Sequence, residues 1–149
     1  MKICALIPAR YNSSRLPGKP LLLIKGKTMI QRTWEQTCKS NLIDDVYVVT
    51  DDDRIINNCE KFGAKTIKIT EKCLNGTERI CYALDKIENI ENIYDIIVNV
   101  QGDEPFINPK DIDTAIETYK KNINSKNMVC STLHYKLESV DDIYNKNIG

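Results

Sequence analysis

Residues Ile7 to Leu21 read IPARYNSSRLPGKPL, and the interpretation of the whole chain starts from this stretch. An apolar run from Ile3 leads into it, and a second apolar run continues from it to Ile24. Its three prolines restrict φ, while its one glycine admits backbone conformations that other residues resist. The composition therefore predicts a stiff cationic loop after a buried strand. Such a loop is suited to binding an anion, and a polyphosphate is the first candidate. The alternative interpretation is a solvated surface loop that binds no ligand.

The overall composition is that of an ordinary globular protein, with 42% hydrophobic and 28% charged residues among 149. This length fits one domain with its own core. No apolar run reaches the roughly 18 to 20 residues that a membrane helix needs, and no signal-peptide segment opens the chain. We therefore expect a cytoplasmic protein without membrane association. The cysteines form no C-x-x-C pair, so we expect reduced, mostly buried thiols and no zinc site at Cys4, Cys38, Cys59, Cys73, Cys81 and Cys130.

The net charge is zero, but the charges are unevenly distributed. Residues 1–34 hold seven Lys or Arg and no Asp or Glu, whereas residues 35–149 hold fourteen basic and twenty-one acidic residues. A nucleic-acid-binding protein usually carries a net excess of positive charge. The local concentration of cations instead favours a compact anionic ligand, and we expect no nucleic-acid partner.

Short strand-like runs alternate with helical patterns along the chain. We expect strands at residues 2–8, 46–50, 65–69, 96–100 and 128–133, and helices at 28–39, 52–62, 75–87 and 108–121. Thr28, Asp52 and either Asn75 or Thr77 can cap helices, and Gly63 can end one. The alternation predicts an α/β fold: a doubly wound, mainly parallel, Rossmann-like sheet with helices on both faces.

Ligands of such sheets bind beyond the carboxyl ends of the strands, near a switch in strand order. The loop after Ile7, the Thr50-Asp51 dipeptide and the segment from Gln101 to Asp103 all fall on that edge. Their convergence is the strongest physical argument for a ligand site.

Two common nucleotide-binding motifs are excluded. Gly26-Lys27-Thr28 resembles the end of a P-loop, but Leu21 stands where the upstream glycine is required. No G-x-G-x-x-G follows the first strand either. A kinase, a GTPase and a typical dinucleotide-binding fold are therefore disfavoured.

Charged residues in two of these segments are candidates for binding a phosphate and a metal ion. Arg10, Arg15 and Lys19 place three cations within ten residues, enough to neutralise most of a triphosphate. Asp103 lies just past a strand end, where one carboxylate can hold Mg²⁺ together with phosphate and water. The alternatives are a solvated cationic cluster and a plain turn before Pro105.

Two further segments have competing interpretations. The run from Asn75 to Arg79 precedes a helix, and its free backbone N–H groups could bond the polar edge of a base. Local helix-end contacts of Glu78 and Arg79 are the favoured alternative. The three aspartates at 51–53 resemble a metal cluster, but an N-cap at Asp52 is the favoured interpretation. His134, the only histidine, is expected to be structural.

Taken together, these motifs resemble the 3-deoxy-manno-octulosonate (KDO) cytidylyltransferase family, the CMP-KDO synthetases. The motifs occur in the family's order and spacing, and the resemblance covers nearly the whole chain. The motifs that match are residues 7–10, 14–21, 50–51, 76–79 and 99–105. The related sialic acid cytidylyltransferases match less well. The resemblance implies a nucleotide-diphospho-sugar transferase-like fold. It also implies Mg²⁺-dependent transfer of a cytidylyl group from CTP to the 2-hydroxyl of KDO, for lipopolysaccharide-type glycan synthesis, with release of pyrophosphate.

The resemblance also implies roles for individual residues. Arg10 and Lys19 bind the triphosphate, Asp103 holds the metal, and these three form the expected catalytic set. Gln101 faces the sugar. The expected substrate-binding residues are Pro8, Ala9, Ser14, Arg15, Asp51, Asn75, Gly76, Arg79 and Gln101, among which Ala9, Asn75, Gly76 and Arg79 frame the cytosine and ribose. The family often has serine where this sequence has Asn75.

Members of this family are longer than 149 residues. The resemblance therefore implies that residues 1–149 form a single nucleotide-binding α/β domain without the C-terminal part, which supplies a second metal-binding aspartate, most of the sugar pocket and much of the dimer interface. The expected partners are CTP and an acidic sugar, with a possible homodimer or completion by a second polypeptide. A catalytically inactive CTP-binding remnant and a cytidylyltransferase for another acidic sugar stay open.

Overall fold

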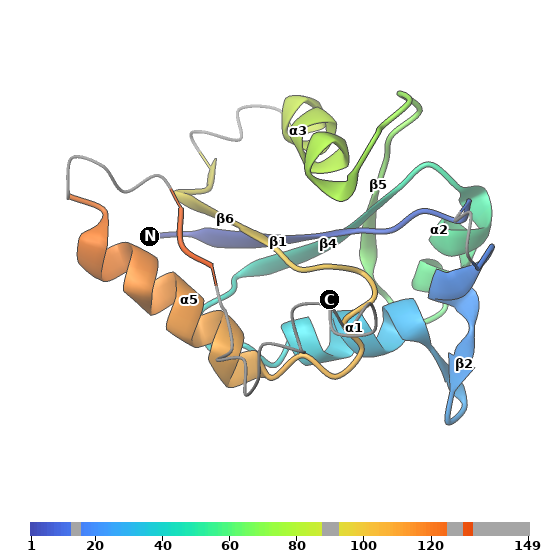
Figure 1. The fold of residues 1–149 in the computed structure, drawn as a ribbon, viewed down its shortest axis with the longest axis horizontal. Coiled ribbons are helices and arrows are strands. Elements are labelled where there is room, and N and C mark those ends of the chain that lie inside the picture. The colour runs from blue at the N-terminus through green and yellow to red at the C-terminus, as the bar shows by residue number, and fades with distance from the viewer. Residues whose placement is uncertain (13–15, 88–92, 125–129, 133–149) are drawn as a thin grey trace, which may run out of the picture.

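A computed structural model describes residues 1–12, 16–87, 93–124 and 130–132 of the chain (Figure 1). In this part, four strands form a parallel sheet in the order β5-β4-β1-β6. The strands are β1 (Ile3–Pro8), β4 (Asp45–Thr50), β5 (Lys65–Lys68) and β6 (Ile96–Asn99). The predicted parallel α/β architecture is confirmed.

The strand order places a switch point beside β1. From β1 the chain adds β4 and then β5 on one side, and β6 then returns to the other side of β1. Ile7 pairs with Val48 in β4, while Leu6 pairs with Asn99 in β6. The carboxyl ends of β1 and β6 therefore lie side by side, where ligands of open parallel sheets bind.

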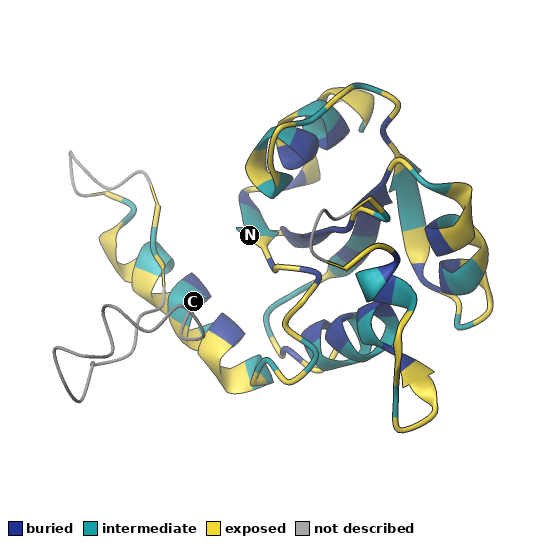
Figure 2. Ribbon diagram, turned by 45° about the vertical axis from the view of Figure 1, so that its right-hand side comes forward, coloured by how far each residue is buried: buried dark blue, intermediate teal, exposed yellow. Residues whose placement is uncertain are grey.

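Helices cover both faces of the sheet (Figures 1 and 2). All six residues of β1 are buried, and their side chains alternate between two cores. Ile3, Ala5 and Ile7 belong to the core on the side of α1 (Met29–Thr37), α2 (Asp53–Glu60) and α5 (Pro109–Asn122). Cys4 and Leu6 belong to the core that includes Ile80 and Ala83 of α3 (Gly76–Lys86). A buried central strand with apolar residues throughout follows from this double coverage.

Helices α1, α2 and α3 begin at caps that the sequence indicated, and Asn108 caps α5 at the expected start of that helix. The side chains of Thr28, Asp52, Asn75 and Asn108 accept hydrogen bonds from backbone N–H groups in the first turns of α1, α2, α3 and α5. Asn75, rather than Thr77, is therefore the cap of α3. Helix α2 ends at Glu60, and Gly63 (φ 77°) completes the turn that follows it.

The apolar run after the cationic loop does not join the main sheet. Leu21 ends a short 3-10 helix, η1 (Lys19–Leu21), and β2 (Leu23–Ile24) pairs with β3 (Lys27–Thr28) in a small antiparallel hairpin. Leu23 is 70% exposed on this hairpin.

The predicted burial of the cysteines is partly wrong, and the last predicted strand lies partly outside the described residues. The cysteines are free thiols as expected, but only Cys4 and Cys59 are fully buried and Cys73 is half-buried. The other three are exposed, because Cys38 lies at the end of α1, Cys81 lies on the outward face of α3 and Cys130 lies outside any helix or strand. Residues 130–132 form no strand, while the rest of the strand predicted at 128–133, and His134, lie outside the described residues. No helix in the described ranges is long and apolar enough to cross a membrane.

Candidate functional site

The cationic loop is tied down at both of its described ends. The Ala9 N–H donates to the carbonyl of Val49 at 2.9 Å, which holds the start of the loop to β4. The Gly18 N–H donates to the carbonyl of Tyr11 at 2.8 Å and closes the base of the loop. Gly18 has a φ of 73° and leads directly into η1 with Lys19. The closed base of the loop therefore fixes the backbone position of Lys19.

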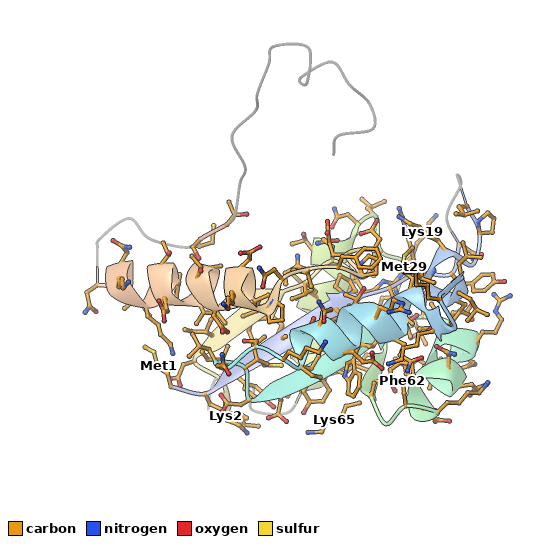
Figure 3. All side chains as sticks on the ribbon, turned by 90° about the horizontal axis from the view of Figure 1, so that it is seen from below. Met1, Lys2, Lys19, Met29, Phe62 and Lys65 are labelled. Atoms are coloured by element: carbon orange, nitrogen blue, oxygen red, sulfur yellow. The ribbon has the colours of Figure 1, made fainter. Side chains whose placement is uncertain are left out.

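Lys19 and Asp103 form an ion pair across the switch point. Lys19 Nζ lies 2.8 Å from Asp103 Oδ2, although the two residues are 84 positions apart. The side chains are 37% and 54% exposed, so both remain accessible to a ligand. Figure 3 shows Lys19 at the opposite end of the molecule from Met1 and Lys2, which precede β1. The structure thus brings together the cation predicted to bind phosphate and the carboxylate predicted to bind metal.

Glycines allow three elements to approach one another beside this pair. A Cβ atom on Gly102 would lie 2.6 Å from the carbonyl oxygen of Pro8, so only glycine fits there. A Cβ atom on Gly76 would lie 3.2 Å from Pro8 Cγ and 3.5 Å from Gln101 Oε1. The end of β1, the start of α3 and the segment after β6 therefore converge on Pro8. Thr33 of α1 supports this point, since its hydroxyl proton is shared between the carbonyl of Gly102 at 3.2 Å and that of Met29 in its own helix at 3.1 Å.

Arg79 contributes a buried cation with spare hydrogen-bonding capacity. The residue is 4% exposed, and its Nη2 lies 3.1 Å from Asp51 Oδ2. Its Nη1 is buried and has no hydrogen-bond partner within the described residues. A buried donor without an acceptor costs about 1–3 kcal/mol, so a ligand oxygen or nitrogen that reached Nη1 would gain a favourable bond.

The two neighbours of Arg79 at the start of α3 have local roles. The Asn75 side chain accepts from the Glu78 N–H at 2.9 Å, and Glu78 Oε2 accepts from the Leu74 N–H at 2.6 Å. The helix-end interpretation is therefore correct for Glu78. It is wrong for Arg79, which reaches across to Asp51 instead.

The three aspartates after β4 do not form a metal cluster. Asp51 pairs with Arg79, Asp52 with Arg54 and Asp53 with Lys68. Among the described residues, no group of three or more His, Cys, Asp or Glu side chains is arranged to hold a metal ion. The Arg54 hydrogen bond lowers the pKa of Asp52, which caps α2 as the sequence indicated.

Other predicted site residues are only partly placed. Arg10 is exposed beside the buried Ala9, at the carboxyl end of β1. Ser14 and Arg15 lie outside the described residues. Tyr11, Thr33 and Arg54 were not predicted to contribute to the site. Thr33 and Arg54 contact segments far from them in sequence, at Gly102 and Tyr11. Tyr11 lies inside the cationic loop but was assigned no role there. The one available signal was Thr33, a polar residue on the apolar face of its helix.

A hollow of about 960 Å³ lies on the far side of β6 from β1. It is lined by residues 95–101, which include β6, by Glu104 and residues 106–108, by α5 and by residues 130–132. The lining carries acidic side chains at Asp95, Glu104 and Asp111, and no Lys or Arg is among its described residues.

Comparison with known proteins identifies the family and agrees with the fold. The family model described as cytidylyltransferase matches residues 4–148. The chain belongs to the cytidylyltransferase family. A cytidylyltransferase of known structure, CMP:2-keto-3-deoxy-manno-octonic acid synthetase complexed with CTP, superposes with a TM-score of 0.77 at 40% identity; the match covers 83% of this chain and 49% of that chain.

Curated cytidylyltransferases are similar over almost the full chain. The 3-deoxy-manno-octulosonate cytidylyltransferase of Thermodesulfovibrio yellowstonii is 43% identical over 98% of this chain and 56% of its own length. The 8-amino-3,8-dideoxy-manno-octulosonate cytidylyltransferase of Shewanella piezotolerans is 38% identical over 96% of this chain and 57% of its own length. The chain therefore spans little more than half the length of these cytidylyltransferases.

Proposed function

We propose that this chain is the nucleotide-binding part of a cytidylyltransferase that activates KDO with CTP to give CMP-KDO and pyrophosphate. The observation that carries the proposal is the Lys19–Asp103 ion pair at the β1–β6 switch point. Without a nucleotide, the two residues neutralise each other. With CTP and a divalent cation, Lys19 would turn to a phosphate and Asp103 to the metal. Membership of the cytidylyltransferase family supports the same assignment.

The remaining residues divide between the two ends of CTP. Arg10 would bind the triphosphate beside Lys19, with Ser14 and Arg15 in the same loop. Arg79 Nη1 would donate to the base or ribose, since it is buried without a partner among the described residues. The rest of the proposed substrate-binding set is Pro8, Ala9, Asp51, Asn75, Gly76 and Gln101.

The chemistry is an in-line displacement at the α-phosphorus of CTP by the 2-hydroxyl of the sugar. A P–O bond to the sugar oxygen forms as the bond from the α-phosphorus to pyrophosphate breaks, and the hydroxyl proton passes to water. In this type of reaction a protein contributes mainly positioning and stabilisation of charge. Arg10 and Lys19 would stabilise the negative charge that gathers on the departing pyrophosphate, while Gln101 would orient the sugar.

Asp103 fits a magnesium ion of the kind that phosphate chemistry uses. Mg²⁺ usually takes one or two carboxylates, with phosphate oxygens and waters as its other ligands. Asp103 offers one half-exposed carboxylate on the edge where the triphosphate would lie. When bound, Mg²⁺ would neutralise charge on the phosphate oxygens. We place the reaction in cytoplasmic lipopolysaccharide-type glycan synthesis.

We also propose that the sugar site is completed by a further portion of polypeptide seated on the β6 side. The hollow beside β6 is lined by acidic, neutral polar and apolar side chains and lacks Lys and Arg among its described residues, so it cannot by itself neutralise a sugar carboxylate. The curated relatives carry over 40% of their length beyond the matched part. That portion, in the same polypeptide, a second polypeptide or a homodimer, would supply the missing cations.

Pyrophosphate release tests the proposed activity. Residues 1–149 are incubated with CTP, KDO and Mg²⁺, alone and with the unmatched portion of the Thermodesulfovibrio yellowstonii relative. We expect CTP binding by residues 1–149 alone and pyrophosphate release when the second portion is present. Binding without release under both conditions would favour an inactive CTP-binding remnant, and failure to bind CTP would contradict the proposal.

The identity of the sugar needs a separate comparison, because one relative is named for an 8-amino sugar. The completed enzyme is assayed with KDO and with 8-amino-3,8-dideoxy-manno-octulosonate. The proposal predicts higher kcat/KM for KDO, and the opposite order would reassign the substrate.

A further inference from the structure

We propose that Arg54 is a positioning residue that holds Lys19 in place through Tyr11. This inference rests on the proposed function only in one respect, that the ligand contacted by Lys19 is CTP. Arg54 lies in the first turn of α2, on the β4 side of the cationic loop.

The first contact is between Arg54 and the ring of Tyr11. The Arg54 guanidinium carbon lies 3.2 Å from the centroid of the ring. A guanidinium over an aromatic face is attracted by the ring's quadrupole. Tyr11 also packs against the core shared by α1, α2 and α5, so its ring is held by both contacts.

The guanidinium is itself fixed by Asp52. Arg54 Nε donates to Asp52 Oδ1 at 2.8 Å and Nη2 donates to Asp52 Oδ2 at 2.6 Å. Asp52 is in turn fixed as the N-cap of α2, where it accepts from the Arg54 N–H at 3.0 Å. A two-point Arg–carboxylate pair sets the plane of the guanidinium. Because this pair already compensates the Arg54 charge, Arg54 is suited to orienting Tyr11 rather than to binding phosphate.

The second contact is between Tyr11 and Gly18. The carbonyl of Tyr11 accepts from the Gly18 N–H at 2.8 Å. A Cβ atom on Gly18 would lie 3.2 Å from Tyr11 ring atoms, so the ring packs directly on the Gly18 backbone. Gly18 precedes Lys19, whose Nζ reaches Asp103. A chain of direct contacts therefore runs from α2 through Tyr11 and Gly18 to the reactive edge.

The contact at Gly18 provides a test without nucleotide. Arg54→Met removes the cation over the ring, and Lys61→Met is the matched control, since Lys61 is an exposed cation that follows the same helix. Hydrogen exchange of the Gly18 amide is measured by NMR. We expect exchange about twofold to fivefold faster in Arg54→Met than in Lys61→Met, the range set by an exposed cation–π contact. Arg54→Lys, which keeps a cation over the ring, should restore part of the protection. Equal exchange in the two methionine variants would overturn the inference.

A second arm tests whether Arg54 acts through Lys19. The affinities for CTP and CMP are measured in Mg²⁺ by calorimetry. Arg54→Met should weaken CTP binding about twofold to fivefold and leave CMP binding essentially unchanged, because only CTP carries the β- and γ-phosphates that Lys19 would contact. In a Lys19→Met background the effect of Arg54→Met on CTP should disappear. An equal loss for CMP, or an undiminished effect without Lys19, would show a general structural role instead.

The two arms separate this inference from the proposed function. A wild-type chain that bound no CTP would contradict the proposed function, while the Gly18 amide would still decide whether Arg54 holds the loop. Thermal unfolding of each variant is the stability control. Arg54 is largely exposed, with a side chain 57% accessible, so we expect its loss to leave folding intact.

Discussion

Adding one methyl group at Gly102 is the most informative perturbation of the site. In Gly102→Ala the new Cβ would lie 2.6 Å from the carbonyl oxygen of Pro8, whereas real Cβ contacts essentially never fall below 3.0 Å. The Pro8 oxygen is a backbone atom and the new Cβ is bonded directly to the backbone of residue 102, so the end of β1 and the segment after β6 must separate by at least about 0.4 Å. Insertions of this kind cost about 1–3 kcal/mol of unfolding free energy.

The same displacement should reach the ligand site. Gly102 is flanked by Gln101 and Asp103, and its carbonyl accepts from Thr33. Moving this segment shifts Asp103 relative to Lys19, so CTP binding in Mg²⁺ should weaken by more than the stability change alone would cause. Urea unfolding gives the stability, and calorimetry under fully folded conditions gives the CTP affinity.

Gly63→Ala is the matched control. Gly63 has a φ of 77° and nothing within 4 Å of an added Cβ. Alanine there pays about 1–2 kcal/mol for the left-handed conformation, but Gly63 lies after α2 and away from the site. The two variants should therefore lose similar stability, and only Gly102→Ala should lose CTP affinity. Unchanged stability and affinity in Gly102→Ala, or equal affinity losses in both variants, would refute the reasoning.

Three further predictions concern Asp45, Thr33 and Asp103. The Lys65 hydrogen bond, with help from Tyr94 and Lys2, lowers the pKa of Asp45 from 3.8 to about 2. Because the pKa of Asp45 is lower in the folded state than in the unfolded state, the ionised carboxylate stabilises the fold above pH 4, and this stabilisation is lost as the pH falls from about 4 to 2. At 1.36 kcal/mol per pKa unit it amounts to about 2 kcal/mol of unfolding free energy. Acid unfolding of Asp45→Asn should lack this pH dependence. Thr33→Val should lower the unfolding free energy by about 1 kcal/mol, measured in urea, because Thr33 is fully buried and bonds to the Gly102 carbonyl; a change near zero would remove Thr33 from the account. Asp103→Asn should leave the midpoint of thermal unfolding unchanged, since Asp103 is half exposed, but should remove the Mg²⁺ dependence of CTP binding. An undiminished effect of Mg²⁺ in calorimetry would exclude Asp103 as the metal ligand.

Much of the fold was predictable because its signals are local. Thr28 and Asp52 are capping side chains placed immediately before helical patterns, and they cap α1 and α2. The uniformly apolar run of β1 correctly indicated a strand buried on both faces. From such local signals, the order of strands and helices follows with few alternatives.

The site was predictable only in outline, because its contacts are long-range. Strand ends indicated that Lys19 and Asp103 share one edge, but not that they form an ion pair. The stacking of Arg54 on Tyr11 joins segments 43 positions apart and left no periodic signal in the sequence. Arg79 was expected to make local contacts, since a charged residue near a helix start usually does. Instead it is buried and its side chain donates to Asp51, just after β4.

The central claim is that a triphosphate binds between Lys19 and Asp103. Calorimetric titration of the wild-type chain and of Lys19→Met with CTP and CMP, in the presence of Mg²⁺, tests it most directly. We predict that the wild-type chain binds CTP more tightly than CMP and that Lys19→Met loses this preference while still binding CMP. Equal affinities in the wild type, or a CTP preference that survives in Lys19→Met, would contradict the account.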